Sequence, residues 1–340
     1  MSKRDSRPPT MNDVAELAGV SQTTVSFVIN KRTDVNIPQE TQDRVWAAVG
    51  ELGYRANVLA RSLRTQRSGL LGFITDEIAI SPHAGKIFEG AQDVAWAHVK
   101  ILLLINTKND PDMIDAAIET LLERQVEGII YATMYHRPVH PPENLHEVPT
   151  VLLDCYAEDR SFPSVVPAEV EGARNATQHL LKQGHRRIGF INHVDDIPAT
   201  HGRLQGYKQA LADFDIPFDE DLVRVCWAEQ KGGYDQTIAL MQMPDPPTAL
   251  FYFNDRTAMG AYDALRKLNL SIPDDVAVIG FDNQKLISAH LHPSLTTMEL
   301  PHYRMGEWAV NKLISLIEGE DHDPLVQHKI ECPLIKRDSA

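Results

Sequence analysis

Residues 10–30, TMNDVAELAGVSQTTVSFVIN, decide how the rest of the chain is interpreted. Their pattern predicts two short helices joined by a tight turn. Thr10 is expected to cap the first helix, and Asp13 three residues later completes a pattern close to a capping box. Gly19 is expected to end that helix, because glycine adopts a left-handed backbone at little steric cost. Ser21 is placed to cap the second helix.

Both helices are expected to bury one face. Apolar residues recur at helical spacing: Val14, Leu17 and Ala18 on the first helix, and Val25, Val28 and Ile29 on the second. Gln22, Thr23 and Phe27 lie on the opposite face of the second helix. A helix-turn-helix presents this face to the DNA major groove, where Gln reads adenine and Thr or Phe packs on a thymine methyl. Residues 10–30 alone also fit a helical hairpin that caps some other fold.

A second motif distinguishes these possibilities. Residues 13–26 read DVAELAGVSQTTVS, and residues 57–63 read NVLARSL. In this order and at this spacing, they resemble the N-terminal signature and the hinge motif of the LacI/GalR family of bacterial repressors. Four later segments match recurrent parts of that family, so the resemblance covers nearly the whole chain: GHRRIGF (184–190), ND (254–255), GFDN (280–283) and LIKRDS (334–339).

The resemblance implies three parts of the chain. They are a helix-turn-helix DNA-binding domain (1–56), a hinge helix and linker (57–68), and a periplasmic-binding-protein-like core for effector binding and dimerisation (69–340). In the first part a third helix is expected, with Asn36 as its cap and Pro38 near its first turn. The core has no heptad extension, so the expected assembly is a homodimer.

From residue 69 onward, short apolar runs alternate with helical stretches. The runs are LLGFIT (70–75), ILLLIN (101–106), GIIYAT (128–133), TVLLD (150–154), RIGFIN (187–192), ALFYF (249–253) and AVIGFD (277–282). Because polar and apolar residues do not alternate within them, we expect strands buried on both faces in parallel βαβ units. The pattern therefore predicts an α/β fold of two doubly wound subdomains, separated by a break near residues 164–167. The resemblance implies crossovers near residues 165, 293 and 325.

Charge is distributed unevenly along the chain. The net charge of the 340 residues is −14, which alone would not favour binding to DNA. Residues 1–68, however, hold ten Lys/Arg against seven Asp/Glu, whereas residues 69–340 hold 23 against 40, so the two segments carry +3 and −17. The N-terminal segment can therefore approach phosphates while the acidic body stays off the duplex.

The resemblance also implies contacts with DNA outside the base-reading face. Leu63 matches the leucine that the family inserts into the minor groove, and an apolar wedge there unstacks and bends the duplex. Leu63 could instead anchor the linker in a core. Six residues match phosphate-contacting positions, which fix register without reading sequence: Ser21, Thr24, Ser26, Asn30, Tyr54 and Asn57. The expected partner is a pseudo-palindromic double-stranded operator.

Effector-binding residues are expected where the core strands end, because open α/β sheets bind ligands at the carboxyl ends of their strands. By resemblance, Arg203 contacts the effector, Asp255 binds its hydroxyls, and Asp282 borders the cleft. Trp227 lies near the family's stacking position, although an ungapped match places Ala228 there. These residues suit a sugar, with a purine corepressor as the alternative. Turn or core roles are the alternatives for each residue.

Two departures from the family pattern affect which DNA and which ligand are bound. Phe27 stands where much of the family has an arginine, so the guanine contact that arginine makes is not expected. Residues 166–169, VPAE, lack the aspartate that usually follows that strand. Neither departure changes the expected class, a transcriptional repressor whose operator affinity a small molecule controls.

Rival classes lack their signatures in this sequence. There is no GxGxxG, GxxxxGK[ST], HExxH, GxSxG or CxxC motif, so neither an enzyme nor a cofactor or metal site is predicted. A hydrolase that uses scattered carboxylates stays open as a less favoured alternative. The N-terminus lacks an apolar signal segment, no run reaches membrane-spanning length, and the three cysteines are scattered. The expectation is a cytoplasmic protein, which disfavours a periplasmic sugar receptor.

Overall fold

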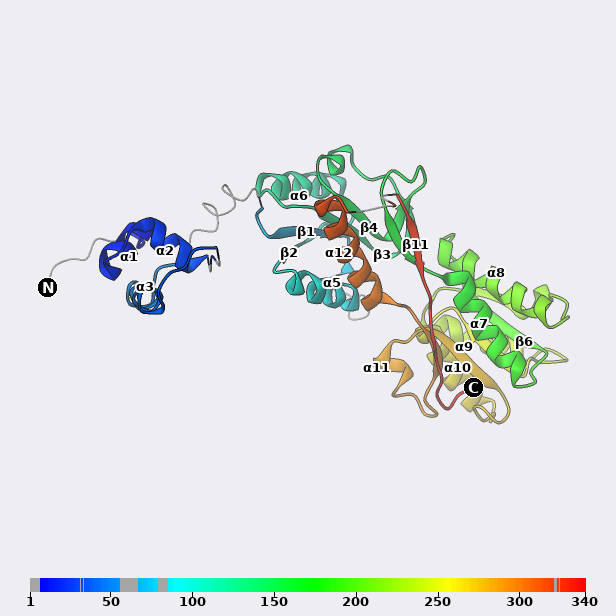
Figure 1. Ribbon diagram of the computed structural model, residues 1–340. Helices are drawn as coiled ribbons and strands as arrows, with labels where there is room; N and C mark the ends of the chain where they lie inside the picture. The colour runs from blue at the N-terminus through cyan, green and yellow to red at the C-terminus, as the bar shows by residue number, and fades with distance from the viewer. Residues whose placement is uncertain are drawn as a thin grey trace. The chain divides into compact units, whose positions relative to one another are not determined.

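The computed structural model describes residues 7–30, 32, 34–55, 67–78, 85–320, 323 and 325–340 (Figure 1). It divides into two compact units, Met1–Ser68 and Gly69–Ala340. The first unit is helical and the second is α/β, so the fold class inferred from the sequence is confirmed.

In its described part, the first unit has three helices, α1 (Met11–Ala18), α2 (Gln22–Ile29) and α3 (Gln39–Leu52). The expected capping box is present, since Thr10 Oγ1 accepts from the Asp13 amide and the Asp13 carboxylate accepts from the Thr10 amide at 2.7 Å. Ser21 Oγ accepts from the Thr24 amide at 3.1 Å and caps α2. Gly19 ends α1 with φ 65°. Local sequence thus sets these helix boundaries.

Two details of this unit were predicted wrongly. Leu17 is 47% exposed, because the face of α1 that meets the other helices is formed by Val14, Ala15 and Ala18. The residue before α3 is Pro38, whose ring offers no side-chain cap, and Asn36 does not serve as one. The proline fixes φ near its helical value, which explains how α3 begins without a side-chain acceptor.

The second unit contains two six-stranded sheets, each the centre of one subdomain. The first sheet has the order β11-β5-β4-β3-β1-β2, formed by Gln327–Ile330, Ser164–Pro167, Thr150–Ala157, Ile129–Val139, Leu70–Thr75 and Ile101–Asn106. The second has the order β12-β10-β9-β8-β6-β7, formed by Leu334–Ile335, Thr296–Glu299, Ala277–Asp282, Ala249–Tyr252, Ile188–His193 and Val223–Cys226. All pairings are parallel except β10 with β12.

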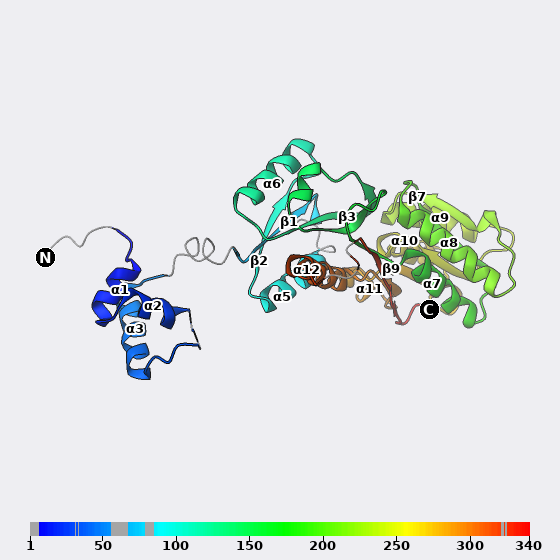
Figure 2. The ribbon, with the colours of Figure 1, turned by 45° about the horizontal axis from the view of Figure 1, so that its top comes forward.

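Helices cover both sheets. Those of the first subdomain are α5 (Gly85–Ala97), α6 (Pro111–Glu123) and α12 (His302–Glu318), with a short 3-10 helix at Glu143–Glu147. Those of the second are α7 (Glu169–Lys182), α8 (Pro198–Asp213), α9 (Gln230–Met241), α10 (Asp255–Lys267) and α11 (Lys285–Ser288), with a 3-10 helix at Glu220–Leu222. Figures 1 and 2 show α5 beside α12 and α7 beside α8.

The chain passes between the subdomains three times. The passages lie near residue 168, at residues 300–301 and at residues 331–333, so the second and third fall later than expected. The break predicted at residues 164–167 is strand β5. The strand β2 is largely accessible in the single chain, because it lies at the edge of its sheet, which contradicts the expectation of burial on both faces.

Candidate DNA-binding and effector sites

The exposed face of α2 carries the three residues predicted to read bases. Gln22 and Thr23 are exposed, Phe27 is half-buried, and Val25 and Val28 form the buried face. Helix α2 therefore has the amphipathic form that a recognition helix needs. The base contacts of Gln22, Thr23 and Phe27 themselves stay predictions.

Arg32 lies against Phe27. The guanidinium carbon of Arg32 is 5.3 Å from the Phe27 ring centroid, within cation–π range. Arg32 Nε also donates to Asp34 Oδ1 at 2.5 Å. The positive charge of Arg32 thus lies beside Phe27, the position where much of the family carries an arginine. Asp34 already pairs with that charge.

The predicted phosphate-contacting residues lie at four places. Ser21 and Thr24 form the α2 cap, with their hydroxyls 2.9 Å apart. Asn30 Nδ2 donates to the Ser26 carbonyl at 2.6 Å at the end of α2, and Tyr54 packs against the small helical core. Asn57 lies outside the described residues, as does Leu63, so their predicted roles at the hinge are not tested.

In the core, Arg203 of α8 is a deeply enclosed member of the predicted effector residues. Its side chain is 3% exposed. Nε donates to Glu169 Oε2 at 2.8 Å and Nη2 donates to Glu169 Oε1 at 3.3 Å, while Nη1 donates to the Phe253 carbonyl. The guanidinium carbon lies 4.3 Å from the Phe253 ring centroid and 3.7 Å from that of Phe281. Arg203 is thus held by one carboxylate and two aromatic rings.

Asp282 adds a second carboxylate at this arginine. It ends β9 with φ 104°, and its Oδ1 lies 3.7 Å from Arg203 Nη1. Burial works to lower the pKa of the Arg203 guanidinium, but the charges of Glu169 and Asp282 outweigh that effect and raise it. Two predicted effector residues, Arg203 and Asp282, are therefore brought together.

Asp255 is placed differently. It is fully buried at the start of α10. Its Oδ1 accepts from Thr297 Oγ1 at 2.6 Å, and its Oδ2 accepts from the Gln284 amide at 2.7 Å. Burial raises the pKa of Asp255 well above its ordinary value. In this conformation the Asp255 carboxylate holds the loop after β9. This supporting role does not require Asp255 to contact an effector directly.

Trp227 lies just beyond β7 and is 64% exposed. Its ring makes an edge contact with His193, with centroids 5.9 Å apart. His193 in turn lies 5.1 Å from the Phe253 ring that covers Arg203. Trp227 is thus an accessible aromatic surface connected through His193 to the surroundings of Arg203.

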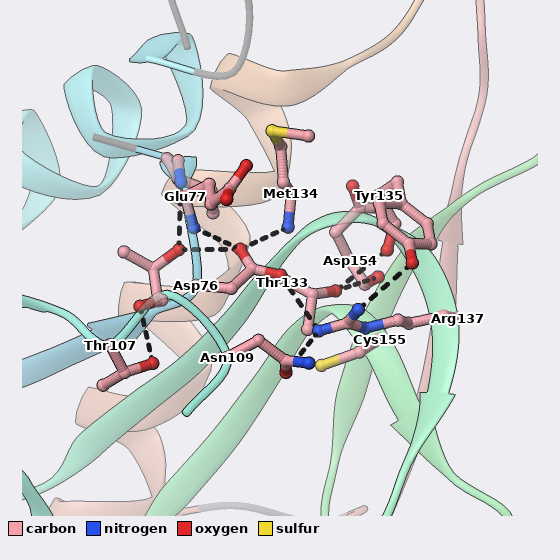
Figure 3. A network of polar contacts seen from close by, with 12 residues as sticks. Asp76, Glu77, Thr107, Asn109, Thr133, Met134, Tyr135, Arg137, Asp154 and Cys155 are labelled. Carbon is pink, nitrogen blue, oxygen red and sulfur yellow. Dashed lines mark hydrogen bonds and ion pairs between the residues drawn. The ribbon is translucent and has the colours of Figure 1, made fainter. Parts of the chain in front are cut away.

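The first subdomain contributes a second arginine–carboxylate pair (Figure 3). Arg137 Nη2 lies 3.0 Å from Asp76 Oδ2, at the end of β1, and also donates to Asn109 Oδ1 at 3.0 Å. Asp76 Oδ1 accepts from the amides of Glu77 and Met134. The pair therefore ties β1, β3 and the loop after β2 together.

Two buried polar groups, Asp154 and His136, interact electrostatically with Glu169 and Arg203. Asp154 Oδ1 and His136 Nδ1 have no hydrogen-bond partner among the described residues. Burial raises the pKa of Asp154 well above its ordinary value, and the charges of Glu169 and Asp76 add to that shift. Burial lowers the pKa of His136, and the charge of Glu169 opposes that shift. Residues of both subdomains therefore lie within electrostatic range of one another.

We call this set of residues the junction. It consists of Asp76, His136, Arg137 and Asp154 from the first subdomain and Glu169, Arg203 and Asp282 from the second. Glu169, Arg137 and His136 were not singled out from the sequence. The sequence pointed to Glu169 only indirectly, through the missing aspartate in residues 166–169. That departure indicates an unusual segment but not which of its residues pairs with Arg203.

Comparisons with known proteins agree with this architecture. Residues 10–57 match the family of bacterial regulatory proteins of the lacI family, and residues 177–340 match the periplasmic binding protein-like domain. The chain is 32% identical to the HTH-type transcriptional repressor PurR of Aliivibrio salmonicida, over 92% of this chain and 94% of that protein. It is 34% identical to the ribose operon repressor of Escherichia coli strain K12, over 91% of this chain and 93% of that protein.

Solved structures agree as well. The lac repressor dimer bound to operator and the anti-inducer ONPF superposes with a TM-score of 0.77 at 26% identity, over 98% of this chain and 99% of that one. The complex of the transcriptional regulator CelR with cellobiose gives 0.66 at 28% identity, over 98% and 100%.

Together, the helix-turn-helix unit and the two-sheet core define a DNA-binding transcriptional repressor under the control of a small-molecule effector, not an enzyme. The chain belongs to the LacI family of bacterial regulators. Within the described part of the chain, no helix has the length and apolar character needed to cross a membrane. Among the same residues, no group of three or more His, Cys, Asp or Glu is placed to hold a metal ion.

Proposed function

We propose that this regulator binds a pseudo-palindromic operator as a homodimer and that a sugar controls its affinity for that operator. The observation that carries the proposal is the convergence of Arg203 and Asp282 near the end of β9, with the accessible ring of Trp227 nearby. Carboxylate and guanidinium groups pair with sugar hydroxyls, and an aromatic ring packs on the apolar face of a pyranose. Asp255 supports this arrangement by holding the loop after β9.

The ligand would act by favouring one arrangement of the two subdomains. Glu169, Arg203 and Asp282 belong to the second subdomain, whereas Asp154 belongs to the first. A ligand that contacts both sides binds one arrangement better than the other, and only that difference in affinity can change operator binding. The CelR complex with cellobiose supports a sugar, while the relatives named PurR keep purines in the test.

The homodimer would use the apolar edge beside β2. Trp96, Val99, Ile101 and Leu104 are exposed in the single chain. Large exposed apolar residues gathered around one strand are typical of a protein interface. Sedimentation of the Ile101→Asp variant should show a monomer where the unchanged protein is a dimer, and Leu325→Asp, at another exposed leucine, should not. Dimers that persist in Ile101→Asp would contradict this interface.

A thermal-shift panel on the full chain tests the sugar. A ligand at 100 times its Kd adds about 2.7 kcal/mol to the stability of the native state. Monosaccharides, disaccharides and purines form the panel. Stabilisation by a sugar that is lost in Asp282→Asn would support the proposal. Stabilisation by a purine alone would replace the sugar by a purine corepressor.

Operator binding is tested separately, on a library of duplexes. Gln22→Ala should reduce the preference for the selected duplex over random DNA about tenfold or more, because a bidentate base contact is worth roughly 1–3 kcal/mol. Binding to random DNA, which rests on phosphates, should change little. An unchanged preference would remove Gln22 from the base-reading set.

A further inference from the structure

Arg203, the cation expected to meet the effector, is already neutralised inside the protein. Glu169 accepts two of its hydrogen bonds, at 2.8 Å and 3.3 Å, and both side chains are at most 5% exposed. Asp282 lies 3.7 Å from the same guanidinium. The faces of that guanidinium lie against Phe253 and Phe281. One positive charge is therefore balanced by two carboxylates before any ligand arrives.

Among the residues that the structure describes, the opposite side of the junction offers no spare cation either. Arg137 is paired with Asp76 at 3.0 Å and also donates to Asn109. Asp154 adds a buried carboxyl group, and His136 is buried in surroundings that disfavour its protonation. Lys329 of β11 acts on His136 electrostatically, but its side chain is exposed. Across the junction, four carboxyl groups face two arginines.

We propose that the effector is an uncharged, hydroxyl-rich molecule such as a free sugar, and that Glu169 excludes anionic ligands, including sugar phosphates and sugar acids, by occupying Arg203. This inference rests on the proposed function of the junction as the effector site, and it adds the charge class of the ligand and the residue that selects it.

The physical reason lies in the cost of displacing Glu169. An anion that paired with Arg203 would have to push the Glu169 carboxylate aside, and that group would then be buried without a partner. The anion would also meet the carboxyl groups of Asp154 and Asp282. Hydroxyl groups have no such difficulty, because they can donate to Asp282 and exchange hydrogen bonds with the unpartnered Asp154 Oδ1 without adding charge.

The test compares charged and uncharged probes on the full chain. Ligands are offered in matched sets at equal ionic strength: ribose with ribose 5-phosphate, glucose with glucose 6-phosphate and gluconate, cellobiose, and inorganic phosphate alone. Glu169→Gln keeps the size of the side chain and removes its charge. Glu171→Gln, on the exposed face of the same helix, is the matched control for net charge. Binding is measured by calorimetry and by thermal shift.

The expected result is that Glu169→Gln binds inorganic phosphate about 10-fold to 100-fold more tightly than the unchanged protein or Glu171→Gln, the range expected for hydrogen bonds to a charged group. The double variant Glu169→Gln/Arg203→Gln should lose that gain. If Glu169→Gln fails to fold, Asp282→Asn, which also removes a charge beside Arg203, should give a smaller gain of the same sign.

Two results would overturn the inference. One is an unchanged protein that binds a phosphorylated or acidic sugar more tightly than its uncharged counterpart. The other is a folded Glu169→Gln variant whose phosphate affinity equals that of Glu171→Gln. Operator binding, measured in parallel by fluorescence anisotropy on the unchanged protein, distinguishes these failures from a failure of the proposed regulatory function, since an anion-selective repressor would still bind its operator.

Discussion

The two arginines of the junction are held in different ways. Arg203 is 3% exposed, and its partner Glu169 is 5% exposed. Arg137 is 18% exposed and pairs with Asp76 at 8%. The Arg203 guanidinium packs on two buried rings, whereas that of Arg137 lies 5.0 Å from the ring of Tyr135, which is itself accessible. One arginine is fixed by packing and the other by polar contacts at the edge of solvent.

This difference suits two functions in a junction that responds to ligand: one arginine keeps its geometry and the other adjusts. A buried, paired charge is costly to disturb, because its partner cannot be rehydrated without opening the core. The Arg137–Asp76 pair, whose arginine is 18% exposed, can exchange hydrogen bonds with water at a lower cost. We therefore expect the Arg203 side to keep its geometry when a ligand binds and the Arg137 side to adjust.

The largest expected effect is that of Arg203→Ala. It leaves Glu169 buried without its cation, and breaking such a pair costs about 3–5 kcal/mol. Urea unfolding followed by circular dichroism measures the loss in the core. The double variant Glu169→Gln/Arg203→Met should lose much less, because neither charge remains. If Arg203→Ala lowered the free energy of unfolding by less than about 1 kcal/mol, Glu169 and Arg203 would not form a buried ion pair.

Arg137→Ala should cost less, about 1–2 kcal/mol in the same experiment. Asp76 keeps its two backbone donors, the amides of Glu77 and Met134, and water can reach the vacated position. Equal losses for Arg137→Ala and Arg203→Ala would remove the contrast between the two sides of the junction.

Sequence reasoning located some strands of both subdomains and missed others. The apolar runs at residues 70–75, 101–106 and 277–282 match β1, β2 and β9, because strands of a parallel sheet covered by helices carry continuous apolar segments. Strands β5 (SVVP), β7 (VRVC) and β10 (TTME) each include polar residues or proline, and β12 has two residues, so none of them shows a continuous apolar run. Their pairing is decided by the rest of the sheet.

The residues of the junction likewise divide into those that sequence reasoning found and those that it missed. Arg203 and Asp282 were found by resemblance and do meet in the structure. Glu169 lies 34 residues before Arg203, and Asp76 lies 61 residues before Arg137. Pairs at such distances are a property of the folded chain, and no local spacing indicates them. The accessibility of β2 was missed for a related reason, since an apolar run has the same appearance in a central strand and in a strand at the edge of a sheet.

Asp154→Asn tests the electrostatic link between the two sides. Burial and the charges of Glu169 and Asp76 raise the pKa of this carboxyl in the folded protein. The folded state therefore holds the proton more tightly than the unfolded chain, and stability is lost as pH rises from the ordinary pKa through the folded one. Asp154→Asn should raise the Tm more at pH 8 than at pH 5. Asp159→Asn, at an exposed carboxyl whose pKa is lowered by hydrogen bonds to Ser161, should not. Equal Tm changes for Asp154→Asn at both pH values would mean that Asp154 titrates normally.

The smallest expected effect is that of Tyr135→Phe. It removes the hydroxyl that accepts from Arg137 Nη1 at 3.2 Å and keeps the ring beside the guanidinium. Since this contact is exposed, the free energy of unfolding should change by no more than about 0.5 kcal/mol. Phe253→Leu is the counterpart on the other side. It removes a ring from a buried guanidinium and should cost more than about 1 kcal/mol. If the two losses were equal, aromatic packing would not be what fixes Arg203, and the rigidity assigned to its side of the junction would have to come from the Glu169 carboxylate alone.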